Sequence, residues 1–184
     1  MAVTGRRWAQ ELRYFWFEDM SPRDVWNPTE ALDAELRRRF GREWSALRLR
    51  PAHEFTGSAK EALAAVLLFD QIPRNIFRGS ACSFATDPLA RTITRRAIAS
   101  GLDRLLSRRE RQFLYMPLMH SEAIADQRLS LRLFTGLGRP FGMPFARSHY
   151  RAVARFGRFP HRNALLGRRS TAAEEKAVAN GMKW

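Results

Sequence analysis

The sequence has little that would support an extracellular or membrane-bound protein. Its 184 residues include a single cysteine, Cys82, which cannot form an internal disulfide bond or supply a cysteine metal cluster. The longest apolar run, residues 62–69, is well short of the roughly 20 residues that a transmembrane helix needs. Residues 1–7 are basic, but no uninterrupted apolar segment follows them, so we expect no secretory signal peptide. We therefore predict a cytoplasmic protein without a membrane span.

Acidic residues and lysine are scarce where the positive charge is highest. The chain has 32 basic and 18 acidic residues, a net charge of +14. Lysine occurs only at positions 60, 176 and 183, and residues 127–173 hold ten arginines and no acidic residue. Because the planar guanidinium binds carboxylate and phosphate groups at two points, this segment suits recognition of an anion. A genome rich in G and C would also favour arginine codons, and composition alone does not separate the two explanations.

The sequence also lacks strand patterns, and helical periodicity dominates. No run of alternating apolar and polar residues is bounded by hairpin turns. Trp8, Leu12, Phe15 and Trp16 have the spacing of one buried helix face. We predict helices over residues 7–17, 123–137 and 145–156, and further helix starts near Thr29, Ser58, Asp87, Ser107 and Thr171.

Prolines and glycines divide these helices. Pro73 is predicted to stop the helix that starts at Ser58, which places Asp70 in a last turn. Pro117 is predicted to kink or break its helix, and Asp87 before Pro88 has the position of an N-cap. The sequence therefore predicts an all-α protein, with residues 1–184 forming a single domain of short antiparallel helices. No strict repeat period is present.

Four segments resemble one known family. Residues 70–79, 84–88, 115–122 and 156–163 carry its motifs, and Phe15, Trp16 and Phe17 resemble its opening. On these residues the chain is identified as similar to the bacterial domain of unknown function 924. The resemblance implies a fold similar to tetratricopeptide-like helical arrays, and it implies no established activity.

Two of the motifs place polar side chains at proline-marked turns between large apolar residues, over residues 67–78 and 155–166. Burying a neutral polar group without a partner costs roughly 2–7 kcal/mol, and a charge costs more, so these groups need partners. The partners are either one another or a ligand. The candidate ligand-binding residues are Asp70, Arg74, Asn75, Arg78, His120, Glu122, His161, Arg162 and Asn163.

Two functions are compatible with these residues. The first is a binding module for an anionic small molecule or an acidic partner segment, in a groove lined by the two Pro-Arg-Asn turns. The second is an enzyme acting on a phosphorylated or carboxylated substrate, with Asp70, His120, Glu122 or His161 in acid/base roles. The structural alternative is that Asp70 pairs with Arg74 or Arg162, while the two asparagines satisfy backbone groups. No catalytic residue is assigned by sequence alone.

No metal site or cofactor is predicted. His120 and Glu122 are two residues apart, which on a helix places them on different faces and not at the i, i+4 spacing of a helical metal pair. Cys82 has no histidine beside it in the sequence, so a nucleophilic role for its thiol is not expected.

A row of arginines is the remaining candidate, as an anion-binding surface. The row consists of Arg147, Arg151, Arg155 and Arg158, and its spacing predicts one helix face. The opposite face is predicted to be buried and consists of Phe145, His149, Ala152, Val153 and Phe156. Because like charges at i, i+4 cost roughly 0.2–0.5 kcal/mol per pair, an anion should offset the row. That anion could be Glu122 and Asp126, a phosphate-bearing ligand or RNA. Binding of nucleic acid through this row is a third possible function, although no nucleic-acid-binding motif is present.

Overall fold

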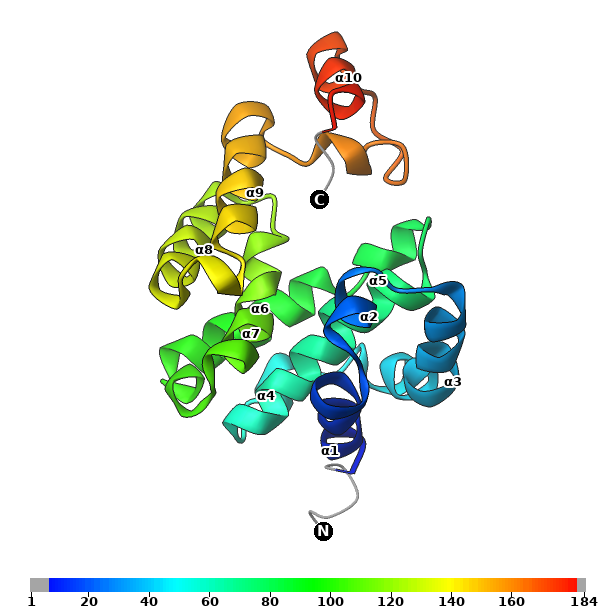
Figure 1. The fold of residues 1–184 in the computed structure, drawn as a ribbon, viewed down its shortest axis with the longest axis vertical. Coiled ribbons are helices and arrows are strands. Elements are labelled where there is room, and N and C mark those ends of the chain that lie inside the picture. The colour runs from blue at the N-terminus through cyan, green and yellow to red at the C-terminus, as the bar shows by residue number, and fades with distance from the viewer. Residues whose placement is uncertain (1–6, 182–184) are drawn as a thin grey trace. The chain divides into compact units, whose positions relative to one another are not determined.

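The computed structural model describes residues 7–181, and the regular elements in that range are all helical (Figure 1). This confirms the all-α fold class. Among the described residues, none of the helices has both the length and the apolar content of a membrane span. Residues 1–6, which bear on the expected absence of a signal peptide, lie outside the described part of the chain.

The chain divides into two compact units, Met1–Leu114 and Tyr115–Trp184. The first unit holds α1 (Arg7–Tyr14), α2 (Pro22–Trp26), α3 (Glu30–Leu47), α4 (Ala59–Val66), α5 (Ile72–Ile76) and α6 (Asp87–Ala99). The boundary falls inside α7 (Arg108–Met119). The second unit holds α8 (Ile124–Leu137), α9 (Met143–Phe156) and α10 (Ala172–Ala179). The single domain, the antiparallel order and the tetratricopeptide-like arrangement stay predictions.

Most of the predicted helix starts are confirmed by side-chain caps. The hydroxyl of Thr29 accepts a hydrogen bond from the N–H of Leu32, and Ser58 caps α4 in the same way. Ser107 and Thr171 form complete capping boxes with glutamates three residues later. Such caps are each worth about 1 kcal/mol and depend only on neighbouring residues, which is why sequence locates them well.

The predicted stop at Pro73 is wrong. Helical backbone continues from α4 through a π-helical turn, Leu67–Gln71, into α5. Proline disrupts a regular α-helix because it lacks an N–H and its ring meets the carbonyl four residues earlier. The wider π-helical turn shifts that pattern, and Pro73 then falls in the first turn of α5, where no donor is required. Asp70 consequently lies inside the π-helical turn and not in a last turn.

Two further helix predictions need comment. Pro117 does not break its helix, since α7 continues to Met119, and a kink at Pro117 stays a prediction. Asp87 is not an N-cap: α6 begins at Asp87 itself, and the capping position belongs to Thr86. The hydroxyl of Thr86 makes no cap; it donates to the carbonyl of Phe69 and accepts from the indole N–H of Trp44.

Large apolar side chains form the core of the first unit. Leu12 of α1 and Phe15 and Trp16 of the π-helical turn that follows it, Phe15–Asp19, are buried as predicted, whereas Trp8 is only half-buried. The ring of Trp16 meets Phe113 edge-on with 5.7 Å between centroids, and Phe55 meets Phe69 at 5.1 Å. Each fully buried side chain of this kind stabilises the fold by roughly 1.5–3 kcal/mol.

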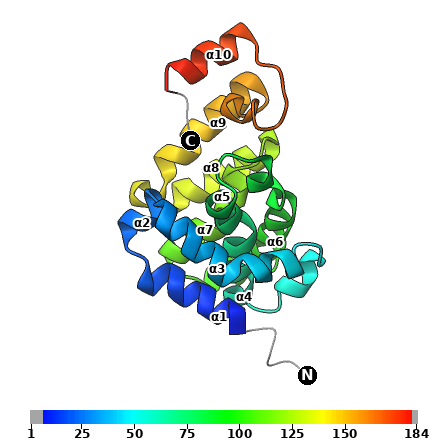
Figure 2. The same cartoon turned by 90° about the vertical axis from the view of Figure 1, so that its right-hand side faces the viewer.

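The core of the second unit lies between α8 and α9, which run side by side (Figure 2). Phe134 of α8 is fully buried. Ala152 and Val153 of α9 pack with Phe159, which follows the helix. This arrangement leaves the other sides of α8 and α9 exposed.

Candidate functional site

The first Pro-Arg-Asn turn contains a buried ion-pair network. Asp70 is fully buried, and its Oδ1 lies 3.1 Å from Nη1 of Arg74. The same guanidinium binds Asp87 at two points, 2.9 Å and 3.0 Å, and donates to the backbone carbonyl of Asp70. Burial would lower the pKa of Arg74, but the two carboxylates raise it above its ordinary value. The network ties the π-helical turn to the start of α6.

The remaining polar groups of this turn are also paired. Asn75 donates to the backbone carbonyl of Gln71 at 3.0 Å and accepts from Arg78 at 3.2 Å. Arg78 binds Asp33 of α3 at two points, 2.9 Å and 3.0 Å. All four candidates of the first unit therefore have protein partners.

Glu122 organises the second Pro-Arg-Asn turn. Its carboxylate accepts two hydrogen bonds from Arg168, at 2.6 Å and 2.9 Å, and one from the N–H of Phe159 at 2.8 Å. Burial would raise the pKa of Glu122, but these donors hold it below its ordinary value. Arg162 donates to the carbonyl of His120 at 3.0 Å, and Asn163 donates to the hydroxyl of Ser170 at 3.0 Å.

Three histidines gather around the buried ring of Phe159. The rings of His149 and His161 lie 5.4 Å and 5.8 Å from it, and His120 lies 6.1 Å from His149. Burial is the main cause that lowers the pKa of His149 to about 3 and that of His161 to about 4. Both rings are therefore neutral at pH 7. Within residues 7–181, no group of three or more histidine, cysteine, aspartate or glutamate side chains is placed to hold a metal ion.

The histidine cluster was missed by sequence reasoning, which treated His149 as an isolated residue of a buried face. Its burial is confirmed, and its Nδ1 lies 2.8 Å from the carbonyl of Phe145. Because a carbonyl only accepts, Nδ1 carries the proton. Nδ1 of His161 is buried and has no hydrogen-bond partner among the described residues.

The groove predicted from the sequence would be lined by residues of both units. Asp70, Arg74, Asn75 and Arg78 belong to the first unit, and His120, Glu122, His161, Arg162 and Asn163 belong to the second. Each group is held together within its own unit, as described above. A groove formed by both Pro-Arg-Asn turns stays a prediction.

The arginine row is shorter than predicted. Arg147, Arg151 and Arg155 are exposed on α9, but the helix ends at Phe156 and Gly157 adopts a left-handed conformation with φ 70°. Arg158 is thereby turned away and binds Glu174 of α10 at 2.6 Å and 2.8 Å. That hydrogen bond is the main cause that lowers the pKa of Glu174 to about 2.

The predicted buried face of α9 needs correction at both ends. Phe145 is 59% exposed, because the neighbouring Ala146 takes the buried position in the first turn of α9, and Phe156 in the last turn is only half-buried. His149, Ala152 and Val153 are buried as predicted.

The predicted anionic partners of the row are engaged elsewhere. Glu122 binds Arg168, and Asp126 is buried and accepts a hydrogen bond from Ser121 at 2.7 Å. Arg128 and Arg132 of α8 are exposed and lie one turn apart. With Ala125, Leu131 and Tyr150 they line an open hollow of about 530 Å³ between α8 and α9. Sequence reasoning saw these two arginines only as part of the basic segment.

Comparisons with known proteins agree on the fold and name no activity. The model of a family described as "Bacterial protein of unknown function (DUF924)" matches residues 12–182. The solved structure of a protein of unknown function, ATU0120 from Agrobacterium tumefaciens, is 38% identical with a TM-score of 0.89. That match covers 94% of this chain and 97% of the other. The search of curated proteins found no match.

Proposed function

The chain belongs to the bacterial protein family DUF924, whose function is unknown, and on that premise we propose that it is a module that binds an acidic segment of another protein. The segment binds across the exposed sides of α8 and α9. One observation carries the proposal: four exposed arginines of α8 and α9, two of which line the hollow, have no acidic partner in the described residues. These are Arg128, Arg132, Arg147 and Arg151, which we call the arginine face.

The charge balance of the second unit supports this role. Between positions 115 and 181 the sequence has eleven basic and four acidic residues, a difference of +7. Glu122 and Glu174 bind Arg168 and Arg158, and Asp126 is buried. Only Glu175 remains exposed, so the unit lacks enough acidic groups to neutralise the arginine face. An external anion would relieve the repulsion between neighbouring guanidiniums.

The shape of the hollow favours an acidic peptide over other anions. It is lined by the half-buried Leu131 and Tyr150, by the exposed Ala125, and by Arg128 and Arg132. An apolar side chain of the partner contacts Leu131 and Tyr150 while flanking carboxylates meet the guanidiniums, as in other grooves that bind helices or short segments. A single-stranded nucleic acid would need several aromatic platforms, and Tyr150 is the one aromatic residue that lines the hollow.

The acid/base alternative has weaker support. The carboxylates of Asp70 and Glu122 are both bound by arginines, which favours their charged forms. His161 has a pKa of about 4, which makes its neutral ring a poor proton donor at pH 7. These residues have evident structural roles, whereas the arginine face has none.

The proposal is tested with a fluorescent peptide of glutamates around two leucines, whose binding is followed by anisotropy. The test variant replaces Arg128, Arg132, Arg147 and Arg151 with glutamine. An exposed ion pair is worth roughly 0.5 kcal/mol, so losing four should weaken binding by about 2 kcal/mol, or about thirtyfold.

A matched control replaces four exposed arginines of the first unit, Arg23, Arg42, Arg104 and Arg108, with glutamine. This variant has the same net charge and should bind the peptide within about twofold of wild type, because its arginine face is intact. Equal losses in both variants would show that net charge alone attracts the peptide. Binding of a mixed-sequence single-stranded oligonucleotide in preference to the peptide would contradict the proposed partner.

A further inference from the structure

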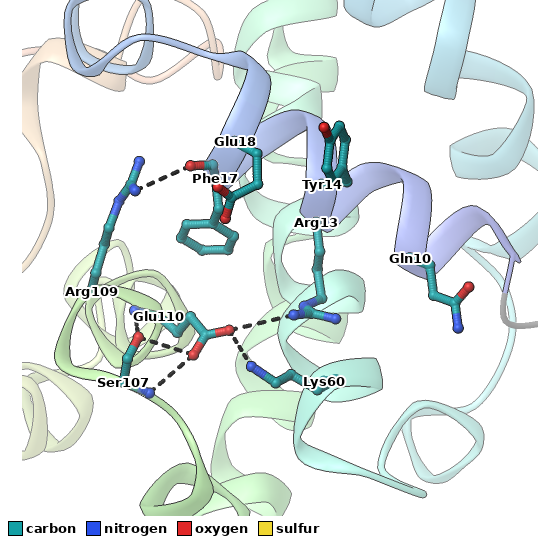
Figure 3. Close-up of a pocket in the computed structure, with 9 residues that line it drawn as sticks. All are labelled: Gln10, Arg13, Tyr14, Phe17, Glu18, Lys60, Ser107, Arg109 and Glu110. Atoms are coloured by element: carbon teal, nitrogen blue, oxygen red, sulfur yellow. Dashed lines mark hydrogen bonds and ion pairs between the residues drawn. The ribbon is translucent and has the colours of Figure 1, made fainter.

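A cavity of about 440 Å³ opens in the first unit, and none of the candidate site residues selected from the sequence lines it (Figure 3). Its walls come from α1 and the turn that follows it, from α4, and from the start of α7. The residues that carry the argument are Arg13, Tyr14, Phe17, Lys60, Arg109 and Glu110. A volume of this size lies within the range of roughly 300–1,000 Å³ that is typical of small-molecule sites.

Glu110 lies between Arg13 and Lys60, and its carboxylate oxygens already accept hydrogen bonds. Oε1 accepts from Nζ of Lys60 at 2.6 Å, and Oε2 accepts from the hydroxyl and the N–H of Ser107 at 2.9 Å and 3.0 Å. Burial would raise the pKa of Glu110, but Lys60 and Ser107 hold it below its ordinary value. The carboxylate is therefore ionised and has little capacity for a further donor.

Glu110 binds Arg13 only weakly. Its Nη2 lies 3.5 Å from Oε1 of Glu110, longer than a charge-assisted hydrogen bond, and its Nε is buried without a hydrogen-bond partner in the described residues. Only 24% of its side chain is exposed, so water does not fully replace the missing acceptors. In Figure 3 the guanidinium of Arg13 points toward Glu110 and Lys60. Because Nε is shielded from solvent, an acceptor in the cavity would bind the Nη atoms of Arg13.

The opposite wall combines a third cation with an aromatic ring. Arg109 donates to the backbone carbonyl of Phe17 at 3.1 Å, and its guanidinium carbon lies 5.3 Å from the centre of the Phe17 ring. These contacts hold Arg109 against the ring. The Phe17 ring also meets Phe113 edge-on at 5.5 Å, and Tyr14 is 62% exposed at the same cavity, so Tyr14 offers the freer aromatic surface to a flat ligand.

The charges of the lining residues indicate how many anionic groups a ligand carries. Arg13, Lys60 and Arg109 contribute three positive charges, and Glu18 and Glu110 contribute two negative ones, which leaves +1. We infer that this cavity binds a small molecule with a single carboxylate on a flat apolar body. The carboxylate meets Arg13 and Arg109, and the body lies against Phe17 and Tyr14. The site is separate from the arginine face and does not depend on the proposed function.

The inference is tested by NMR, with sodium benzoate as the probe and benzamide as its neutral counterpart. In ¹H–¹⁵N spectra of the full chain, benzoate should cause saturable shifts at the amides of Arg13, Phe17 and Arg109. A ligand this small should bind with a Kd on the order of 1 mM, and benzamide should bind more weakly by roughly tenfold. Arg13→Gln and Arg109→Gln should each weaken benzoate binding by roughly tenfold, because each removes a charged donor.

Arg108→Gln is the matched control, since Arg108 is exposed on the same turn of α7 and does not line the cavity. It should leave the Kd for benzoate unchanged. If Arg13→Gln fails to fold, the exposed Arg109 still provides the test. Shifts that do not saturate, an equal response to benzamide, or unchanged binding in both test variants would overturn the inference. Binding of inorganic phosphate without binding of benzoate would contradict the inference that the ligand has a flat apolar body.

Discussion

The guanidinium of Arg158 and the carboxylate of Glu174 are joined by two hydrogen bonds, 2.6 Å from Nε to Oε1 and 2.8 Å from Nη2 to Oε2. This pair connects the chain after α9 to α10 across 16 positions of sequence. It also removes Arg158 from the exposed arginines, although the spacing of the sequence groups it with them. The pair is therefore structural, whereas the arginine face is available to a partner.

The Arg158–Glu174 pair should make stability depend on acid pH. Glu174 has a pKa of about 2 in the folded chain, below the value of about 4.3 for an unperturbed glutamate. Its stabilising contribution is therefore complete above pH of about 4.3 and is lost as the pH falls toward about 2. Urea unfolding at a series of pH values should show a steeper loss in wild type than in Glu174→Gln. Parallel curves for the two proteins would contradict the role of this carboxylate.

Asp70→Asn should destabilise the first unit. The substitution leaves Arg74 with Asp87 alone and removes the charge that the π-helical turn buries. Removing one partner of a buried ion pair costs about 3–5 kcal/mol, and the remaining Asp87 should reduce this to roughly 2–3 kcal/mol. The free energy of unfolding in urea, followed by circular dichroism, measures the loss.

Asp33→Asn is the control for this measurement, because it breaks an ion pair whose arginine, Arg78, is 53% exposed. Its cost should be less than about 1 kcal/mol. Similar losses for Asp33→Asn and Asp70→Asn would contradict the importance assigned to burial.

Phe159→Ala should be among the most damaging substitutions in the second unit. The ring is fully buried, contacts His149 and His161, and lies 4.5 Å from the guanidinium carbon of Arg162. Emptying such a site costs about 3–5 kcal/mol. Phe145→Ala, at an exposed phenylalanine of α9, should cost less than about 0.5 kcal/mol. Comparable unfolding energies for the two variants would contradict the packing around Phe159.

His149 and His161 should remain neutral well below pH 6. Because the folded pKa values of His149 and His161 are about 3 and about 4, and an unperturbed histidine has about 6.5, protonation favours the unfolded chain. Their contribution to stability is therefore complete above pH of about 6.5 and is lost as the pH falls through about 4 and about 3. Imidazole ¹⁵N shifts should show the Nδ1–H form of His149 at pH 5.5. A titration midpoint near 6.5 would contradict this prediction.

The sequence predicted local features well and long-range pairings poorly. Ser107 and Thr171 cap their helices through residues three positions away, so spacing alone was sufficient. The failure at Pro73 had a different origin. A π-helical turn is favoured by the burial of Asp70 and by the pairing of Arg74 with both Asp70 and Asp87, and propensity does not report such contacts.

The same limit applied to the candidate sites. The motifs that contain Asp70 and Glu122 were correctly identified as needing partners. Asp70 pairs with Arg74 of the same motif, as the structural alternative predicted, whereas Asp87, which shares Arg74, and Arg168, which binds Glu122, lie elsewhere in the sequence. Arg13, Lys60 and Arg109 come from three separate helices, and no spacing predicts that they line one cavity. The arginines of α9 were found because i, i+4 spacing is local, and only Arg158, beyond Gly157, was misplaced.

A charge-swap experiment tests the central claim most directly. Arg132 and Arg147 are replaced together by glutamate, and the affinities of two fluorescent peptides are measured, one with glutamates around two leucines and one with lysines in their place. The account predicts that wild type prefers the acidic peptide and that the Arg132→Glu, Arg147→Glu protein prefers the basic one, with the leucines contributing equally to both. The same preference in both proteins would contradict the assignment of the arginine face as the binding surface.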